Sequence, residues 1–127
     1  PSCRPIDPRP HQAVLPADAR YLVYPDLSQV TGFFVKGQTF SLSSFLSNPV
    51  LERRFAEGSM VIARLCPVDY HRFHFPCEGT PDRPVLINGP LFSVNPIALR
   101  KNLSILWENK RFITEIDTKH FGTMLYV

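Results

Sequence analysis

The chain has 127 residues and a formal net charge of +3 at pH 7, with 44% hydrophobic and 20% charged residues. This length suits a single domain over residues 1–127, and the apolar content supports a hydrophobic core and excludes a disordered chain. No run of about 18 apolar residues is present, so no bilayer-spanning segment is expected. The mild positive charge fits either a solvated basic surface or an anionic partner, and we expect no nucleic-acid partner.

The three cysteines are Cys3, Cys66 and Cys77. An odd number of cysteines without a framework spacing argues against a disulfide scaffold and favours a reducing compartment. The proline-rich N-terminal segment lacks the apolar stretch of a signal peptide. We expect any membrane tether to lie upstream of this sequence.

Thirteen prolines divide the chain into short elements, so long helices are not expected. Residues 1–12 predict an extended arm. Two short helices are expected: one capped by Ser41, and one capped by Asn48, begun by Pro49 and ended by Gly58. The first part of the chain also predicts short strands, at residues 14–15, 20–24, 33–35 and 59–66.

The Pro- and Gly-rich residues 76–90 predict a loop. Further strands are expected at residues 91–94, 105–107, 111–116 and 121–127, the last with period-two alternation. The pattern predicts a mostly β (α+β) fold, a sandwich or barrel-like domain with short helices. Because a complete domain rarely ends in the middle of a strand, we expect either that the sequence is truncated there or that another polypeptide completes the fold.

Residues 69–76 read Asp-Tyr-His-Arg-Phe-His-Phe-Pro and form the most informative stretch of the chain. Imidazole is the side chain that titrates nearest neutrality, so His71 and His74 among aromatic neighbours suit proton transfer. In an extended segment, residues three apart point to opposite faces. The spacing therefore allows two distinct roles for the two histidines.

Residue by residue, other interpretations stay open. A histidine between aromatic residues is often structural, and Asp18 after Pro-Ala is typical of an Asx turn. The group Cys66, His71, His74 and Cys77 contains the residue types that bind zinc. Its spacing matches no common zinc finger, so we expect no metal.

Several blocks of the sequence resemble the phosphatidylserine decarboxylase family, and they follow one another in the family's order. L-P-A-D-A-R at residues 15–20 is similar to the family's S-P-A-D-G-R block. R-L-C-P-V-D-Y-H-R-F-H at residues 64–74 resembles R-L-x-P-x-D-Y-H-R-x-H. The other similar blocks lie at residues 4–7, 35–42, 94–96, 108–111 and 121–122, so the resemblance covers nearly the whole chain.

The resemblance implies pyruvoyl-dependent decarboxylation of phosphatidylserine to phosphatidylethanolamine, after autocatalytic cleavage of a proenzyme before a serine. That serine becomes the pyruvoyl group of a small α chain, so the cofactor lies outside this chain, which resembles most of the large β chain. In the implied roles, Asp18 orients His74, His74 is the base for cleavage, and His71 returns a proton after decarboxylation. We expect the residues that contact substrate to be Tyr70, Arg72, Phe73 and Phe92.

The implied partners are the small α chain, phosphatidylserine and a membrane surface, and a homodimer is left open. The expected location is peripheral, on the cytoplasmic face of a bacterial inner membrane, or on an organelle membrane in a eukaryote. Two alternatives remain. One is a related pyruvoyl decarboxylase of a soluble aromatic amino acid, and the other is a noncatalytic or metal-binding β module.

Overall fold

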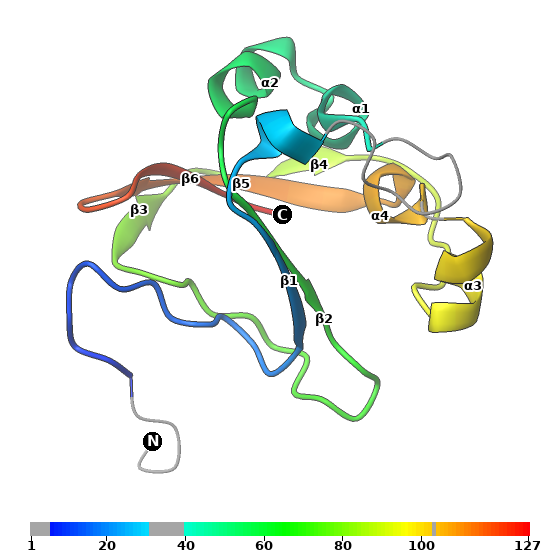
Figure 1. The fold of residues 1–127 in the computed structure, drawn as a ribbon, viewed down its shortest axis with the longest axis horizontal. Coiled ribbons are helices and arrows are strands. Elements are labelled where there is room, and N and C mark those ends of the chain that lie inside the picture. The colour runs from blue at the N-terminus through cyan, green and yellow to red at the C-terminus, as the bar shows by residue number, and fades with distance from the viewer. Residues whose placement is uncertain (1–5, 31–39, 103) are drawn as a thin grey trace. The chain divides into compact units, whose positions relative to one another are not determined.

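The computed structural model describes residues 6–30, 40–102 and 104–127 (Figure 1). Its strands are β1 (Arg20–Tyr24), β2 (Met60–Arg64), β3 (Gly79–Pro81), β4 (Val85–Ile87), β5 (Arg111–Thr118) and β6 (Gly122–Tyr126). Its helices are the 3-10 helix η1 (Leu27–Val30) and the α-helices α1 (Leu42–Leu46), α2 (Pro49–Phe55), α3 (Pro96–Lys101) and α4 (Ile105–Glu108).

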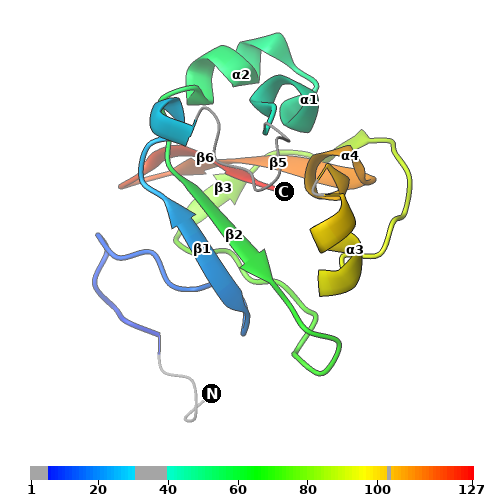
Figure 2. The same cartoon turned by 45° about the vertical axis from the view of Figure 1, so that its right-hand side comes forward.

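The strands form two sheets (Figure 2). One is the pair β1–β2, and the other has β5 at its centre with β3, β4 and β6 paired to it. β3 and β6 both run antiparallel to β5 and share part of its length, so they flank it on two sides. In the described part of the chain, β6 pairs with no other strand. The prediction of a mostly β (α+β) fold is confirmed.

The contacts divide the chain into two compact units, each made of separate segments. The first unit comprises the chain up to Tyr21 together with Ala63–Val85 and Ile113–Val127, and the second comprises Leu22–Ile62 and Leu86–Phe112. A single domain over residues 1–127 stays a prediction.

Side-chain caps begin the two predicted helices of the second unit. The Ser41 hydroxyl accepts the Ser44 N–H at the start of α1. The Asn48 side chain accepts two N–H groups of α2, which then ends at Phe55, before the predicted stop at Gly58. These caps satisfy N–H groups that have no partner within the helix, and both helix predictions are confirmed.

Arg111 completes the other end of α1. Its Nε and Nη2 donate to the carbonyl oxygens of Phe45 and Ser44, both at 2.7 Å, and its Nη1 donates to the Asn109 carbonyl at 2.8 Å. The guanidinium also lies over the Phe45 ring, 5.7 Å from its centroid. The last carbonyls of a helix have no partner within it, so Arg111 supplies the missing donors. Burial lowers the pKa of Arg111.

In the first unit, a tight turn sets the register of β6. The Thr118 hydroxyl donates to the Gly122 carbonyl at 2.6 Å and accepts the Phe121 N–H at 3.0 Å. Gly122 has a φ of 67°, a conformation that favours glycine. The turn places Tyr126 opposite Thr114 of β5.

Two predicted strands in the second unit are wrong. Residues 105–107 lie in helix α4, where the Trp107 and Glu108 N–H groups bond to the Ser104 carbonyl at 2.9 and 2.8 Å. Ile105 and Trp107 are buried, and the Trp107 ring meets Phe40 edge-on at 5.6 Å. Residues 91–94 are irregular and exposed, and helix α3 follows them instead. The signal for α3 was present, since Asn95 caps it and Pro96 begins it, as Asn48 and Pro49 do for α2.

Other boundaries also differ from the predictions. The expected loop at residues 76–90 contains β3 and β4, which pair with β5. The strand predicted to be buried at 59–66 is shorter, and Val61 within it is 55% exposed. The prediction for residues 33–35 lies outside the described residues. The strands predicted at 20–24, 111–116 and 121–127 are confirmed with small changes at their ends.

The role of Arg111 predicts a loss of stability when its donors are removed. Arg111→Met keeps the length of the side chain but removes its hydrogen bonds to the Phe45 and Ser44 carbonyls, so the free energy of unfolding should fall by about 3 kcal/mol. Urea denaturation of the full-length protein, followed by Trp107 fluorescence, measures this. The control is Arg53→Met, because Arg53 is exposed on α2. Equal stability of the two variants would contradict the proposed role.

Candidate active site

Two backbone hydrogen bonds join residues 14–16, just before Asp18, to residues 69–76, which we call the histidine segment. The Val14 N–H donates to the Pro76 carbonyl at 2.7 Å, and the His74 N–H donates to the Pro16 carbonyl at 3.3 Å. This is the register of an antiparallel pair. The two return bonds would need N–H groups at Pro16 and Pro76, which proline lacks, so no regular strand forms. The strand predicted at 14–15 is therefore wrong.

A second contact fixes the backbone next to Asp18. The Ala17 N–H donates to the Tyr21 hydroxyl at 3.1 Å, and that hydroxyl donates to the Ala17 carbonyl. Asp18 follows as an exposed residue. The pairing with His74 thus brings the Asp18 segment beside the histidine segment, and an interaction between the Asp18 carboxyl and the His74 ring stays a prediction.

His71 is held by a compact turn. The Asp69 N–H donates to the Cys66 carbonyl at 2.9 Å, and the Cys66 N–H donates to Asp69 Oδ2 at 2.6 Å. The His71 Nε2 lies 2.8 Å from the same Cys66 carbonyl. Because a carbonyl oxygen only accepts, Nε2 must carry a proton. The neutral ring therefore presents its lone pair on Nδ1.

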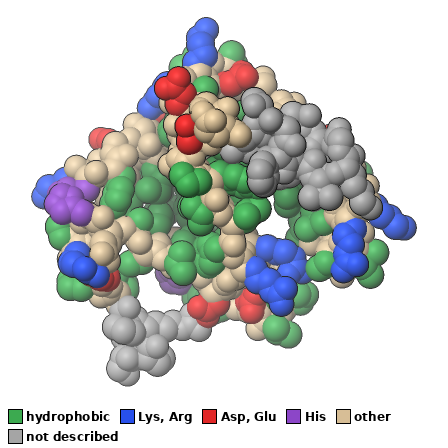
Figure 3. All heavy atoms as spheres, in the orientation of Figure 1, with side chains coloured by type: hydrophobic (Ala, Val, Ile, Leu, Met, Phe, Trp, Pro, Cys, Tyr) green, Lys and Arg blue, Asp and Glu red, His purple; other side chains and the backbone are tan. Residues whose placement is uncertain are grey.

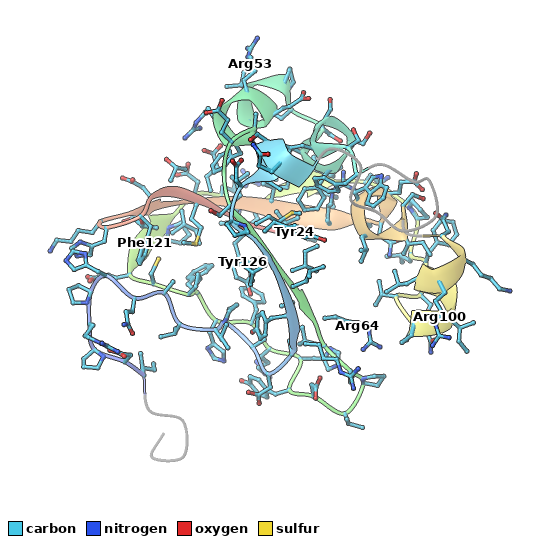
Figure 4. The ribbon with its side chains drawn as sticks, in the orientation of Figure 1. Tyr24, Arg53, Arg64, Arg100, Phe121 and Tyr126 are labelled. Carbon is cyan, nitrogen blue, oxygen red and sulfur yellow. The ribbon has the colours of Figure 1, made fainter. Side chains whose placement is uncertain are left out.

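His74 has different surroundings from His71. Its ring stacks on Tyr70, with centroids 5.8 Å apart and planes 10° from parallel. The neighbouring Phe73 and Phe75 rings lie 5.4 and 5.7 Å from the ring of Tyr126 on β6. Figure 4 shows Tyr126 directed from β6 toward this loop. The last strand of the chain therefore supports the histidine segment through aromatic packing.

The aromatic neighbours are only partly covered. Apolar side chains reach the surface in many places (Figure 3), and Phe73 is 65% exposed. Tyr126 is less exposed. The pKa of its hydroxyl is raised, mainly by burial and to a smaller extent by the nearby Tyr21. Exposed aromatic surface of this kind is typical of a site that another chain or a ligand covers.

The other residues predicted to contact substrate are placed as follows. Arg72 and Tyr70 are exposed within the histidine segment. Phe92 lies in the second unit, where its backbone N–H and carbonyl both bond to the Asn109 side chain, at 2.9 and 2.8 Å. Substrate contact by these residues stays a prediction.

The cysteines do not assemble a metal site with these histidines. The Cys66 thiol accepts a hydrogen bond from Arg64 at 3.4 Å, and it is the Cys66 carbonyl that holds His71. Burial raises the pKa of the Cys77 thiol. Within residues 6–30, 40–102 and 104–127, no three His, Cys, Asp or Glu side chains are grouped closely enough to hold a metal ion.

Sequence reasoning missed four supporting residues: Arg64, Asp69, Tyr21 and Tyr126. The alternation of residues 121–127 gave a signal for the face on which Tyr126 lies, but no local pattern identified the loop it would meet.

An open hollow elsewhere in the first unit contains none of the predicted site residues; it is lined by Glu78, Gly79, Thr80, Asp117, Thr118 and Lys119.

The model of the phosphatidylserine decarboxylase family matches residues 1–127. The chain belongs to this family. It is 53% identical to a phosphatidylserine decarboxylase proenzyme of Chlamydia muridarum over 127 residues. Identity is 49% to the protein of that name in Chlamydia trachomatis serovar L2 and 46% to that of Chlamydia pneumoniae. All of this chain is covered in each case, and it spans 42% of each relative. No helix in the described residues is long and apolar enough to cross a membrane.

The Tyr126 contacts predict that this residue holds the histidine loop in place. Tyr126→Leu removes two ring contacts worth about 0.5–1.5 kcal/mol each, so trypsin should cut after Arg72 roughly tenfold faster. Tyr126→Phe keeps the rings and should behave like the original protein. Phe121→Leu is the matched control, because Phe121 is an aromatic residue in the turn before β6. If Tyr126→Leu is cut no faster than this control, Tyr126 does not support the loop.

Proposed function

We propose that the protein containing this chain decarboxylates phosphatidylserine to phosphatidylethanolamine after autocatalytic cleavage of a proenzyme. The observation that carries the proposal is the hydrogen bond between the His74 N–H and the Pro16 carbonyl. It joins two distant blocks, Pro-Ala-Asp and Asp-Tyr-His-Arg-Phe-His, whose combination is specific to the family. The alternatives, a soluble amino-acid decarboxylase and a noncatalytic module, gain no support from the family match.

The residues of this chain fit a pyruvoyl group carried by a separate small chain. When bound, a pyruvoyl carbonyl supplies the electron sink that ordinary side chains lack. The donor set here, two imidazoles and a carboxyl, suits proton transfer beside such a group. In the described residues the outer edge of β6 has no paired strand, so this edge and the exposed Phe73 ring would hold the small chain.

His71 is suited to return a proton to Cα after carbon dioxide leaves. The Cys66 carbonyl fixes the ring through Nε2, at 2.8 Å. An imidazolium held in this way would donate the proton on Nδ1 and keep the Nε2 proton on the carbonyl. The backbone therefore sets both the direction of transfer and the nitrogen that performs it.

His74 and Asp18 are suited to maturation. His74 would accept the proton of the serine hydroxyl that attacks its own preceding carbonyl, and Asp18 would orient the ring and stabilise its charged form. Two restraints support His74 in this role: its N–H is tied to Pro16, and its ring stacks on Tyr70.

The protein would act at a membrane surface, peripherally, on the cytoplasmic face of a bacterial inner membrane. A net charge of +3 suits attraction to anionic lipid. The small α chain would be its partner within the same proenzyme, and a homodimer stays open.

Variants that lack one of the two histidines are predicted to be blocked at different steps, either proenzyme cleavage or turnover. In the full-length proenzyme, His74→Ala and Asp18→Ala should block cleavage, because the first removes the base that activates the serine and the second removes the carboxyl that orients that base. His71→Ala should still be cleaved but turn over at least about 100-fold more slowly, since a positioned proton donor contributes that much. His120→Ala, in the turn before β6, is the control. Intact mass and carbon dioxide release measure the two steps, and an uncut His71→Ala protein would reverse the assignment.

Substrate choice tests the proposed activity itself. Phosphatidylserine in micelles should release carbon dioxide, while free serine and tryptophan at equal concentration should react far more slowly. The reason is that binding energy from the rest of the lipid can position its headgroup. The mass of the small chain in the same sample reports cleavage and the pyruvoyl group. Faster reaction of a free amino acid would place the protein with the soluble decarboxylases.

A further inference from the structure

Arg64, at the end of β2, is a half-buried cation that the family motifs leave without a role (Figure 4). Its Nη1 donates to the Cys66 thiol at 3.4 Å. Its Nε is shielded from water and has no hydrogen-bond partner in the described part of the chain. A thiol is a weak acceptor, so this contact orients the guanidinium without neutralising it.

A half-buried arginine without a carboxylate partner has a charge that is not balanced and N–H donors that are not all used. The guanidinium is planar and always charged, and it matches the paired oxygens of a carboxylate or a phosphate. The nearest acid along this turn is Asp69, whose Oδ2 already accepts the Cys66 N–H at 2.6 Å. Arg64 is therefore suited to an anion that comes from outside this segment.

Cys66 links Arg64 directly to the candidate proton donor. Its thiol holds the Arg64 guanidinium, and its carbonyl holds the His71 ring. The cation and the imidazole are therefore both anchored to the same residue. Both belong to the first unit, so this placement depends on local contacts only.

The chemistry of decarboxylation decides which anion Arg64 would hold. A cation on the reacting carboxylate stabilises the ground state, and that stabilisation disappears as the carboxylate becomes neutral carbon dioxide, so it would slow the reaction. A phosphodiester keeps its charge throughout, so a cation bound to it stabilises substrate and transition state equally. Arg64 therefore suits the phosphodiester.

We propose that Arg64 binds the phosphodiester of the phospholipid headgroup and so selects the lipid over the free amino acid. This inference rests on the proposed function. His71 then stands at the amino-acid end of the same headgroup and Arg64 at its phosphate end. Arg64 is a specificity-determining residue in this arrangement, and it takes no part in bond breaking.

The test is Arg64→Gln in the full-length enzyme, after cleavage has been verified by mass. KM for phosphatidylserine in mixed micelles should rise about tenfold or more, and kcat should stay within about threefold, as expected for loss of uniform binding. The slow reaction of free serine should not change, because serine has no phosphate. Arg64→Lys should restore part of the affinity, and Arg53→Gln, exposed on α2, is the control.

Binding of glycerophosphoserine gives a second measurement that needs no turnover. This soluble headgroup should raise the thermal midpoint of the original protein and of Arg53→Gln, but not that of Arg64→Gln. Equal shifts in all three overturn the inference, whether or not the enzyme is active on lipid. An unchanged KM, or a loss of cleavage in both Arg64 variants, also overturns it, because the latter indicates a structural role. Failure of the original protein to decarboxylate lipid counts against the proposed function instead.

Discussion

The candidate site depends on a backbone pairing that two prolines keep short. The His74 N–H reaches the Pro16 carbonyl, and the Val14 N–H reaches the Pro76 carbonyl. A longer ladder would have turned both segments into strands with their polar groups used in the sheet. Because Pro16 and Pro76 cannot donate, the pairing ends after two bonds, and the segments that follow leave it as exposed loops. The Asp18 and histidine segments are thus joined without being buried.

The side chains at this site are oriented by hydrogen bonds to the main chain and to the thiol of Cys66. Cys66 is the common anchor, since its N–H binds Asp69, its carbonyl binds His71, and its thiol receives Arg64. The Cys66 carbonyl fixes which nitrogen of the His71 ring carries the proton. In a histidine ring surrounded only by water, neither nitrogen is fixed in this way. The aromatic contacts of Tyr126 then hold the loop against β6. The orientation of Arg64, the tautomer of His71 and the position of the loop are set by three different kinds of contact.

Local signals predicted the elements that local chemistry controls. Ser41 and Asn48 cap helices because their side chains reach N–H groups within the next few residues. The same logic applies to Asn95, whose helix was missed although its signal was equally clear. Residues 105–107 were mistaken for a strand because Ile and Trp favour strands. In the structure the Trp107 and Glu108 N–H groups bond back to the Ser104 carbonyl, so the segment is a helix instead.

The sequence by itself determined the family and the period-two pattern of the last strand, because these depend on residue type and order, and it predicted Asp18, His71 and His74 as site residues on the same basis. Only the tertiary structure decided that Pro16 lies beside His74 and that Tyr126 supports Phe73. The physical reason is distance along the chain. A cap or a turn is fixed by residues within a few positions, whereas these contacts join segments whose meeting depends on how the whole first unit folds.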